Sequence, residues 1–586
     1  MRQWMVAAKK ADFYAIAEKF HVDPVVARII RNREVIGEKN IRIYLGGNLS
    51  DLSDPHQMKD MDRLVEILAQ KIRKQVHIRI IGDYDVDGVT SSHLFLTALR
   101  RVGAKVDVVI PHRIQDGYGL SLHLLQQAKE DGVDTILTCD NGIAAIDEIA
   151  WAKAQKMTVL VTDHHAVPFE EHEGRRTEKK SLADAVVNPH QQDCGYPYKE
   201  LCGAGVAWNV IRVLYENYDM DKREAEDLLD FVAMATVCDV MSLTGENRIL
   251  VKEGLKRIRH TKNIGLQALM QACNVQPENI SAYHFGYVLG PCVNATGRLD
   301  TARHALRLFE TGQETEAEEI ARDLVDLNQE RKELTLQGVE MAKKLCEEGG
   351  YENDPVLVLF LPDVHESIAG LIAGRIREMY NRPVFVLTRG EEGVKGSGRS
   401  TENYSMYENM CGCAELFTKF GGHPMAAGLS LPEENVEKFR RKINENCPLT
   451  VEEVCPDIHI DMAMPVGYAS TELVHQFALL EPFGKDNPSP LFADRNLSIS
   501  RMWVIGKNRN VLRMSVLSEY GQPVPVIFFG DVETLFAYFT EKFGLEEVEN
   551  ALHGRKNRIL FSMVYTAKID FYQGNENLQL EMKYYR

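Results

Sequence analysis

Membrane spans, signal peptides and the motifs of several large enzyme classes are missing from this sequence. No run in its 586 residues approaches eighteen consecutive apolar residues, so it predicts no membrane span. The N-terminal residues lead into charged sequence without an apolar signal core, and we therefore expect no secretion. The G-x-x-x-x-G-K-S/T and G-x-S-x-G motifs are absent, and His365-Glu366 is followed by Ala369 where H-E-x-x-H requires histidine. These absences argue against an ATP-driven motor, an α/β-hydrolase and a zinc protease.

Cysteine pairs of the C-x-x-C type and an excess of positive charge are also lacking. The eleven cysteines form no metal-binding array, which predicts reduced, mostly buried thiols in the cytoplasm and neither disulfides nor a structural zinc. The net charge of −17 argues against a protein that coats nucleic acid non-specifically. A local basic groove is compatible with this charge, because phosphate contacts depend on the local potential.

The chain is long enough for three or four domains and has an ordinary globular composition, with 45% hydrophobic and 26% charged residues. Its patterns divide it into a helical lead-in over residues 1–50, an α/β domain over 51–305, a connecting helix over 306–350, a second α/β domain over 351–452 and a small β-barrel over 456–586. The fold class is therefore α/β and multidomain, with a parallel sheet in the first domain.

The first α/β domain shows strands and helices in alternation. Apolar, β-branched runs at 77–81, 105–110 and around Ile136 and Val159 predict strands, with a further one at 185–188. Helical stretches at 89–102, 121–131 and 144–155 separate them. The charged stretch 170–180 predicts a surface loop. Farther on, apolar residues recur at helical spacing from Ile320 to Leu345, which predicts a long amphipathic helix.

Acidic residues and histidines follow three of these strands, in the segments 82–88, 138–142 and 162–165. The carboxyl ends of parallel strands meet at one edge of a sheet, where open α/β folds bind their ligands. Carboxylates and imidazoles together suit a divalent metal, and several of them suit a pair of ions. A further carboxylate, Asp239, is expected inside a strongly apolar helix, where it is costly unless it is paired or metal-bound.

A calcium loop is the alternative interpretation of the first segment, because Asp83-x-Asp85-x-Asp87-Gly88 imitates the opening of an EF-hand. That loop requires glutamate at its twelfth position, where this sequence has Leu94, and a helix in front, where it has a strand. The calcium interpretation therefore fails.

The acidic segments resemble the ordered motifs of a known superfamily. Asp85-x-Asp87-Gly88, Asp140-Asn141-Gly142, Asp163-His164-His165 and Asp239 are similar to the four motifs of the DHH phosphoesterases, and Gly421-Gly422-His423 resembles the signature of the DHH-associated domain. With the connecting helix and terminal barrel, the chain is most similar to the bacterial branch that degrades single-stranded DNA from the 5′ end. The resemblance covers nearly the whole chain from about residue 50.

The resemblance implies a two-metal active site in residues 51–305. It implies two Mn²⁺ or Mg²⁺ ions, with Asp140 bridging them, in a ligand set of Asp83, Asp85, Asp87, Asp140, His164 and Asp239. His165 is implied as a catalytic residue beside them. Such an ion pair can activate water and stabilise the charge that develops on phosphorus.

The resemblance also implies the substrate contacts. Phosphate binding is expected of Arg113, Arg298, Ser397, Arg399 and His423, with Ser397 and Arg399 in a Gly-rich loop of the DHH-associated domain. In the barrel, which the resemblance makes an OB-fold-like DNA-binding domain, a basic cluster surrounds an aromatic residue: Arg501, Trp503, Lys507, Arg509 and Arg513. Basic side chains with a stacking aromatic suit single strands. The alternative is Trp503 in the barrel core with the charges merely solvated.

The activity implied is hydrolysis of single-stranded DNA from its 5′ end to 5′-mononucleotides, in DNA repair and recombination. The partners implied are single-stranded DNA, a single-strand-binding protein and a RecQ-type helicase, with a cytoplasmic monomer that binds no membrane. Two alternatives stay open. One is a DHH phosphodiesterase for short oligonucleotides or cyclic dinucleotides, although such proteins lack a comparable barrel. The other is a non-catalytic DNA-binding scaffold of the same fold, although such relatives lose metal ligands that this chain keeps.

Overall fold

The computed structural model describes residues 3–113, 116, 119–172, 175–390, 393–506, 510–572 and 574–586. The chain divides into two compact units, each described by itself. We call Leu52–Met241 with Glu246–Pro456 the core unit, and Gln3–Asp51, Ser242–Gly245 and Asp457–Arg586 the barrel unit. None of the helices within the described ranges has the length and apolar character that a bilayer crossing requires.

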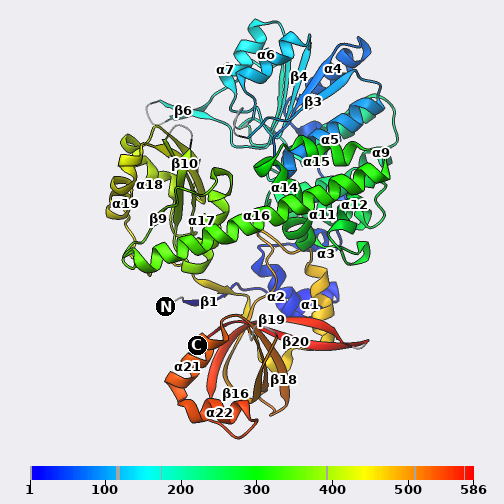
Figure 1. Cartoon of the computed structure of the whole chain (residues 1–586). Helices are drawn as coiled ribbons and strands as arrows, with labels where there is room; N and C mark the ends of the chain where they lie inside the picture. Colours follow the sequence, from blue (N-terminus) through cyan, green and yellow to red (C-terminus); the bar gives the residue numbers. More distant parts are fainter. Residues whose placement is uncertain are drawn as a thin grey trace. The chain divides into compact units, whose positions relative to one another are not determined.

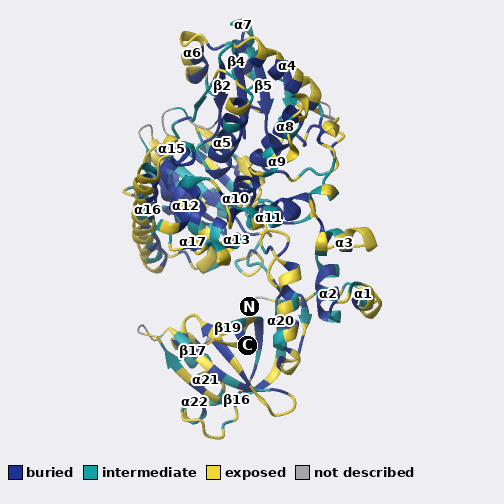
Figure 2. Cartoon of the chain, turned by 90° about the vertical axis from the view of Figure 1, so that its right-hand side faces the viewer, coloured by how far each residue is buried: buried dark blue, intermediate teal, exposed yellow. Residues whose placement is uncertain are grey.

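A five-stranded parallel sheet forms the first part of the core unit (Figure 1). Its strand order is β3-β2-β4-β5-β8, with bounds Val106–Val109, Ile78–Ile81, Thr135–Cys139, Thr158–Thr162 and Ala185–Val187. Every residue of β2 and β4 is buried, because helices cover both faces (Figure 2). Such strands carry nearly continuous apolar sequence, interrupted in β2 by the buried Arg79, which explains why the pattern predicted them.

Two sets of helices cover this sheet. The helices α4, α5 and α8 pack together over one face, and they span Met61–Arg73, Val86–Arg101 and Gly203–Asn217. The helices α6 and α7 pack on the other, where they bury apolar residues against β4 and β5, and they span Leu122–Glu130 and Ile146–Ala154. The alternation of strands and helices expected from the sequence is confirmed.

The charged segment 170–180 is a correction to the sequence analysis, which predicted a loop. It contains two antiparallel strands, β6 (Phe169–His172) and β7 (Arg175–Glu178). The ion pair between Glu170 and Lys179, 2.9 Å apart, lies beside this hairpin. Lys179 is the residue after β7, so its charge meets that of Glu170 across the hairpin, a contact that a composition argument does not detect.

A helical region follows the parallel sheet and ends in one long helix. Its members α9 to α12 span Lys222–Glu226, Leu229–Cys238, Gly245–Ile258 and Ile264–Ala272. Next come α13 (Ala282–His284), a π-helical turn (Phe285–Leu289), α14 (Gly290–Leu299) and α15 (Arg303–Glu310). The helix α16 (Glu314–Glu348) has the amphipathic pattern expected of it and packs against α12, α14 and α17.

The second sheet of the core unit has the order β12-β13-β11-β10-β9. In that order the strands span Lys419–His423, Ala426–Leu431, Gly393–Arg399, Val384–Gly390 and Leu357–Phe360. The helices α16 and α17 (Glu366–Tyr380) pack on one face over β9 and β10. The helices α18 (Met406–Cys411) and α19 (Val436–Glu445) cover the other face. On the α17 side, β11, β13 and β12 extend past the helix and line a cavity described below.

The barrel unit contains a closed ring of five strands. The strands β16, β17, β18, β20 and β19 pair in this order, and β19 pairs again with β16. They span Phe492–Ile505, Val511–Leu517, Pro523–Phe529, Asn575–Tyr585 and Leu560–Tyr572. The short β15 (Met462–Ala463) extends β16, and α20 (Thr471–Phe477), α21 (Val532–Phe543) and α22 (Leu545–Leu552) complete the unit. The expected multidomain α/β fold with a terminal OB-like barrel is confirmed.

The N-terminal helices belong to the same unit as the barrel. The helices α1 (Phe13–Phe20), α2 (Pro24–Asn32) and α3 (Glu38–Gly46) share its apolar core, and β1 (Trp4–Val6) pairs with β14 (Ile458–Ile460). Arg33 forms a buried bidentate pair with Asp461 at 2.7 and 3.0 Å. Segments more than 400 residues apart in sequence thus fold together.

Candidate metal centre and phosphate pocket

The first acidic segment lies between β2 and α5. Asp85 caps α5, accepting a hydrogen bond from the Gly88 N–H at 3.1 Å. Two residues on, Asp87 accepts hydrogen bonds from the N–H groups of Gly203 at 2.6 Å and Ala204 at 2.8 Å, at the start of α8. These helix N-termini favour negative charge and fix both carboxylates. Asp83, which follows the strand, is buried.

Asp140 follows β4 in a left-handed conformation, with φ of 60°. Asn141 holds this turn by donating from Nδ2 to the carbonyls of Ile81, at 3.1 Å, and Cys139, at 2.9 Å. The N-terminus of α8 approaches so closely that a Cβ on Gly203 would lie 2.6 Å from Cβ of Asp140. The backbone therefore leaves Asp140 little freedom to move.

Asp163 is a residue to which the sequence analysis gave no role beyond its motif. It accepts hydrogen bonds from the N–H groups of Ile143 at 2.9 Å and His164 at 2.7 Å, and its Oδ1 lies 2.7 Å from Nδ1 of His165. It thereby fixes the loop after β5 and the ring of His165. A carboxylate directly before two histidines is the signal that could have identified this positioning role.

Asp239 lies at the end of α10, which is a second correction. The apolar sequence around Asp239 predicts a position inside the helix, but α10 ends at Cys238 and Asp239 is its C-cap. Its side chain is 26% exposed, and Oδ2 lies 3.6 Å from Nε2 of His164. A carboxylate at a helix C-terminus is disfavoured by the dipole, so this position needs a compensating positive charge.

The predicted ligand residues come together at this edge of the sheet. Nε2 of His164 lies 3.1 Å from Oδ1 of Asp140 and 3.7 Å from Oδ2 of Asp87. Three groups each have ligand atoms within 4.8 Å of one another: Asp83, Asp85 and Asp140; Asp87, His164 and Asp239; and Asp140, His164 and His165. Asp140 is the carboxylate that two of the three share.

Several buried atoms of this cluster make no hydrogen bond to any described residue. They are Oδ1 of Asp83, Oδ1 of Asp140 and Nε2 of His164; the 3.1 Å approach of the last two does not have hydrogen-bond geometry. Buried polar atoms normally have a partner, and leaving one without costs about 1–3 kcal/mol. The donor set of carboxylate oxygens and one imidazole nitrogen suits Mn²⁺ or Mg²⁺, so the residues fit such ions.

The electrostatics of the cluster support this fit. Burial raises the pKa of Asp83 and Asp140 well above the usual range; the Asp85 carboxylate raises the pKa of Asp83 further, and those of Asp87 and Asp85 raise the pKa of Asp140. Burial likewise lowers the pKa of His164, which favours the neutral form that binds metals. Burial opposes protonation of His165, but its hydrogen bond to Asp163 and the neighbouring carboxylates raise its pKa to about 9. The site accumulates negative charge that cations would offset.

Three arginines form a second cluster in the core unit. Arg113 lies over the ring of Tyr84 at 4.9 Å, and Arg298 donates to the carbonyl of Ser367 at 2.6 Å. Burial and the nearby charges of Arg113 and Arg399 lower the pKa of Arg298 to about 9, and burial with neighbouring arginines also lowers that of Arg399. Within the described ranges, no carboxylate forms an ion pair with Arg113, Arg298 or Arg399. Such a cluster attracts an anion.

Ser397 and Arg399 lie in a strand, which corrects the prediction of a Gly-rich loop. They belong to β11, whose glycines face the sheet's own core: a Cβ on Gly396 would lie 2.4 Å from Cδ2 of Leu387, and one on Gly398 2.3 Å from Sδ of Met406. Alternation then turns Ser397 and Arg399 to the opposite face. The glycines are required by packing and not by a turn.

His423 shares this face. The register pairs His423 with Ala426, and Ala426 with Arg399, so that they form one row across β12, β13 and β11. The next row contains Gly421, Gly428 and Ser397. The residues expected to contact phosphate in the second domain therefore lie in adjacent rows of one sheet face.

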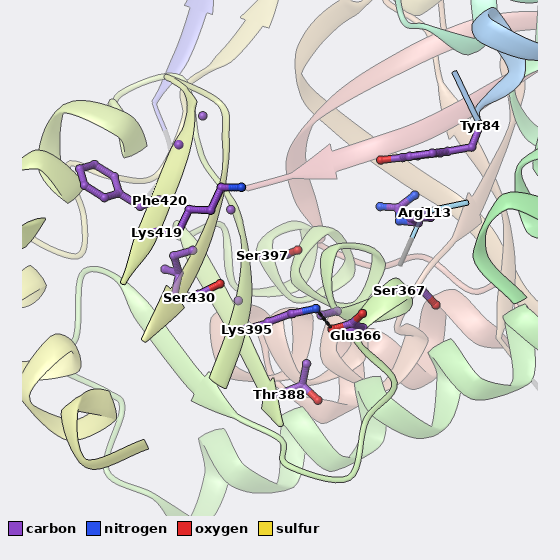
Figure 3. Close-up of a pocket in the computed structure, with 16 residues that line it drawn as sticks. Tyr84, Arg113, Glu366, Ser367, Thr388, Lys395, Ser397, Lys419, Phe420 and Ser430 are labelled. Carbon is purple, nitrogen blue, oxygen red and sulfur yellow. Dashed lines mark ion pairs between the residues drawn. The ribbon is translucent and has the colours of Figure 1, made fainter. Parts of the chain in front are cut away.

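A cavity of about 750 Å³ lies over this face (Figure 3). The second sheet contributes its floor, the start of α17 one side, and Tyr84 and Arg113 of the first domain another. Tyr84 stands between Asp83 and Asp85 in the chain, so the cavity begins directly beside the candidate metal cluster. Of the residues expected to contact phosphate, Arg113 and Ser397 line this cavity, and their contact with substrate stays a prediction.

The barrel residues lie on an outer surface. Arg501 and Trp503 are exposed on β16, and the Arg501 guanidinium lies 5.7 Å from the centre of the indole ring. Arg513 of the neighbouring strand β17 lies opposite Trp503 in the antiparallel register. Met502, Leu512 and Met514 fill the core, so the alternative of a buried Trp503 is wrong. Lys507 and Arg509 fall outside the described residues.

Family models match three parts of the chain. They are the DHH family N-terminal domain at residues 77–236, the DHHA1 domain at 353–447 and the RecJ OB domain at 460–584. Among solved structures, RecJ of Thermus thermophilus in complex with Mn²⁺ superposes with a TM-score of 0.81 at 25% identity, covering 100% of this chain and 79% of that one. A manganese-bound exonuclease RecJ matches at 32% identity and a TM-score of 0.57, covering 66% of this chain and 94% of that one.

Curated relatives agree with these models. The single-stranded-DNA-specific exonuclease RecJ of Haemophilus influenzae is 32% identical over 96% of both chains, and that of Escherichia coli is 31% identical over 95% of both. The Bacillus subtilis RecJ is 33% identical over 87% of this chain, which spans 63% of that relative's length. The expected resemblance to the DHH superfamily is confirmed, and the chain belongs to its RecJ family.

Proposed function

We propose that this protein is a metal-dependent exonuclease that hydrolyses single-stranded DNA from the 5′ end and releases 5′-mononucleotides. The observation that carries the proposal is the juxtaposition of an acidic and histidine cluster with a polar cavity that Arg113 lines. The cluster suits phosphodiester hydrolysis, and the cavity suits a terminal phosphate. The relatives are named single-stranded-DNA-specific exonucleases, which agrees with both.

The metal ligands in this proposal are the clustered residues. Asp83, Asp85 and Asp140 would hold one ion and Asp87, His164 and Asp239 the other, with Asp140 bridging them. When bound, the ions supply Lewis-acid activation of water and stabilisation of charge on phosphorus. Asp163 accepts a hydrogen bond from Nδ1 of His165 and so keeps that ring oriented at the cluster.

The cationic residues bind and orient the strand. Arg113, Arg298 and Arg399 would neutralise the terminal phosphate, Ser397 would donate a hydrogen bond from Oγ, and His423 would contact the same or the neighbouring phosphate. Because Tyr84 links the cavity to the acidic loop, a strand whose terminal phosphate lies in the cavity presents its next linkage to the acidic cluster. This order supports degradation from the 5′ end.

The barrel unit would add affinity for long strands. Arg501, Trp503 and Arg513 offer a stacking surface flanked by positive charge, with Lys507 and Arg509 as further expected contacts. We propose that the enzyme acts as a cytoplasmic monomer in DNA repair and recombination. A single-strand-binding protein and a RecQ-type helicase are the proposed partners, since both supply single strands to such an enzyme.

Digestion of end-labelled DNA tests this function. Single strands and matching blunt duplexes are incubated with Mn²⁺, with Mg²⁺ and with EDTA, beside the Asp140→Asn variant. We expect mononucleotides from single strands only, in the presence of metal and with the wild-type enzyme only. Cleavage in EDTA, or equal cleavage of duplex, would contradict the proposal.

A further inference from the structure

The cavity contains one more row of polar side chains than a terminal monophosphate requires. Beyond the row of Ser397, the register places Lys395, Ser430 and Lys419 side by side on β11, β13 and β12. Thr388 of β10 continues this row, since it pairs with Lys395. All four residues line the cavity (Figure 3). Nothing in the proposed contacts with the 5′-terminal monophosphate uses them.

The spacing of this row suits an extended anion. Rows that are two residues apart lie about 6.8 Å from one another, a distance that two further phosphoryl groups can span. Beside Ser397 in its row the floor is bare backbone, because Gly421 and Gly428 carry no side chain. A phosphate chain that starts at Ser397 and Arg113 can therefore lie along the floor towards the lysines.

The charge and polarity of the row also suit an anion. Lys395 lies 2.8 Å from Glu366, so that the carboxylate in this cavity is neutralised. Lys419 and Arg113 then leave the cavity with net positive charge, and Ser430 and Thr388 supply hydroxyl donors. The lining aromatic Phe420 packs with Phe417 on the other face of the sheet, so it offers no platform to a base.

We propose that this row makes the enzyme competent for strands that carry a 5′-triphosphate. The terminal phosphoryl groups would bind Lys395 and Lys419, while the phosphoryl group attached to the sugar keeps the place of the monophosphate. This inference rests on the proposed function, because it extends the same pocket.

The reaction on such an end follows from the same hydrolysis. A water oxygen bonds to the phosphorus of the first internucleotide linkage, and the bond from that phosphorus to the 3′ oxygen of the terminal nucleotide breaks. The 3′ oxygen takes up a proton. The first product is then an intact nucleoside 5′-triphosphate with a free 3′ hydroxyl, and the shortened strand carries a 5′-monophosphate.

Single-turnover digestion of synthetic DNA strands that differ only in a 5′-triphosphate or 5′-monophosphate tests the proposal. The first product is identified by mass spectrometry, and kcat/KM is measured for both ends. We expect the wild-type enzyme to release a nucleoside triphosphate first. Lys419→Gln should lower kcat/KM for triphosphate ends relative to monophosphate ends by about 10-fold, the loss of one charged hydrogen-bond donor.

Two further variants sharpen the test. Lys395→Gln combined with Glu366→Gln removes the ion pair and leaves neither charge unpaired. This double variant should lower the ratio of kcat/KM for triphosphate ends to kcat/KM for monophosphate ends. Lys438→Gln alters an exposed lysine on α19, which covers the opposite face, and should leave the ratio unchanged. Competition binding of both strands in EDTA gives the ratio without cleavage.

The outcomes separate the two proposals. Degradation of monophosphate strands together with failure on triphosphate strands, or a ratio that Lys419→Gln does not change, overturns this inference and leaves the proposed function intact. If wild-type enzyme fails on monophosphate strands as well, both proposals fall.

Discussion

In the sheet β3-β2-β4-β5-β8 the functional side chains follow the strands, whereas in the sheet β12-β13-β11-β10-β9 they lie within the strands. Asp83, Asp140 and His164 stand on turns at the carboxyl edge, where buried helices and loops converge. Ser397 and Arg399 instead alternate with glycines along β11 and share one face of the sheet, where Ser397 lines an open cavity. One sheet gathers negative groups in a buried cluster, and the other spreads polar and positive groups over a surface.

This difference follows from what each site must do. A pair of cations requires several ligands that converge from different segments, and the edge of a parallel sheet brings them together. An extended phosphate backbone requires donors in a line, which the period of a strand provides. We therefore expect the acidic edge to control turnover, and the strand face to control which end is accepted.

The largest effect should come from the acidic edge. Asp140→Asn removes the carboxylate that two ligand groups share and should lower kcat by about 10²–10³-fold or more, as loss of a charge-stabilising group does. Binding of single strands, measured by fluorescence anisotropy, should persist. Asp147→Asn, an exposed carboxylate on α7, is the control and should retain full turnover. Near-normal turnover of Asp140→Asn at saturating Mn²⁺ would show that Asp140 does not bridge the two metal ions.

A smaller effect, of a different kind, should come from the strand face. Arg399→Ala removes one cation from the arginine cluster and should cost about 1–3 kcal/mol in the preference for 5′-phosphate over 5′-hydroxyl ends, typical of a charged hydrogen bond. The rate of cleavage itself should fall by less than this preference does. The measurement is kcat/KM on both ends, with Arg389→Ala, an exposed arginine of β10, as the control. If kcat/KM falls equally for 5′-phosphate and 5′-hydroxyl ends, Arg399 takes no part in recognising the 5′ phosphate.

The packing of β11 gives a prediction for stability. Gly398→Ala places a Cβ 2.3 Å from Sδ of Met406 and 2.7 Å from Cε1 of Phe385, and should lower the free energy of unfolding by about 1–3 kcal/mol through overpacking. Gly374→Ala is the matched control, since it lies in α17 with no atom within 4 Å and should stabilise the helix slightly. Denaturant unfolding measures both. If Gly398→Ala leaves the free energy of unfolding unchanged, the proposed close packing at this glycine is contradicted.

The smallest effect on chemistry is expected from the barrel. Arg501→Gln with Trp503→Ala and Arg513→Gln should weaken binding of long strands and make it less dependent on salt, because fewer counterions are released. Turnover of short oligonucleotides should change little. An unaltered salt slope of the dissociation constant would mean that this surface does not touch DNA.

The acidic edge could be predicted from sequence because its residues follow strands that are themselves local patterns. Asp85 and Asp140 needed only the rule that parallel strands end together. The glycines of β11 misled the prediction, since only the side chains of Phe385 and Met406, which come from other elements, make them necessary in a strand. The packing of the N-terminal helices with the barrel was also invisible, because no local pattern links Arg33 to Asp461 across 428 residues.

The order in which nucleotides leave a strand tests the central claim most directly. A 5′-phosphorylated single strand with four different nucleotides at each end is digested with Mn²⁺, and the products are identified over time. We predict that the 5′-terminal nucleotide appears first as a 5′-mononucleotide and that the others follow in sequence order. Release from the 3′ end, or internal fragments before mononucleotides, would contradict the account.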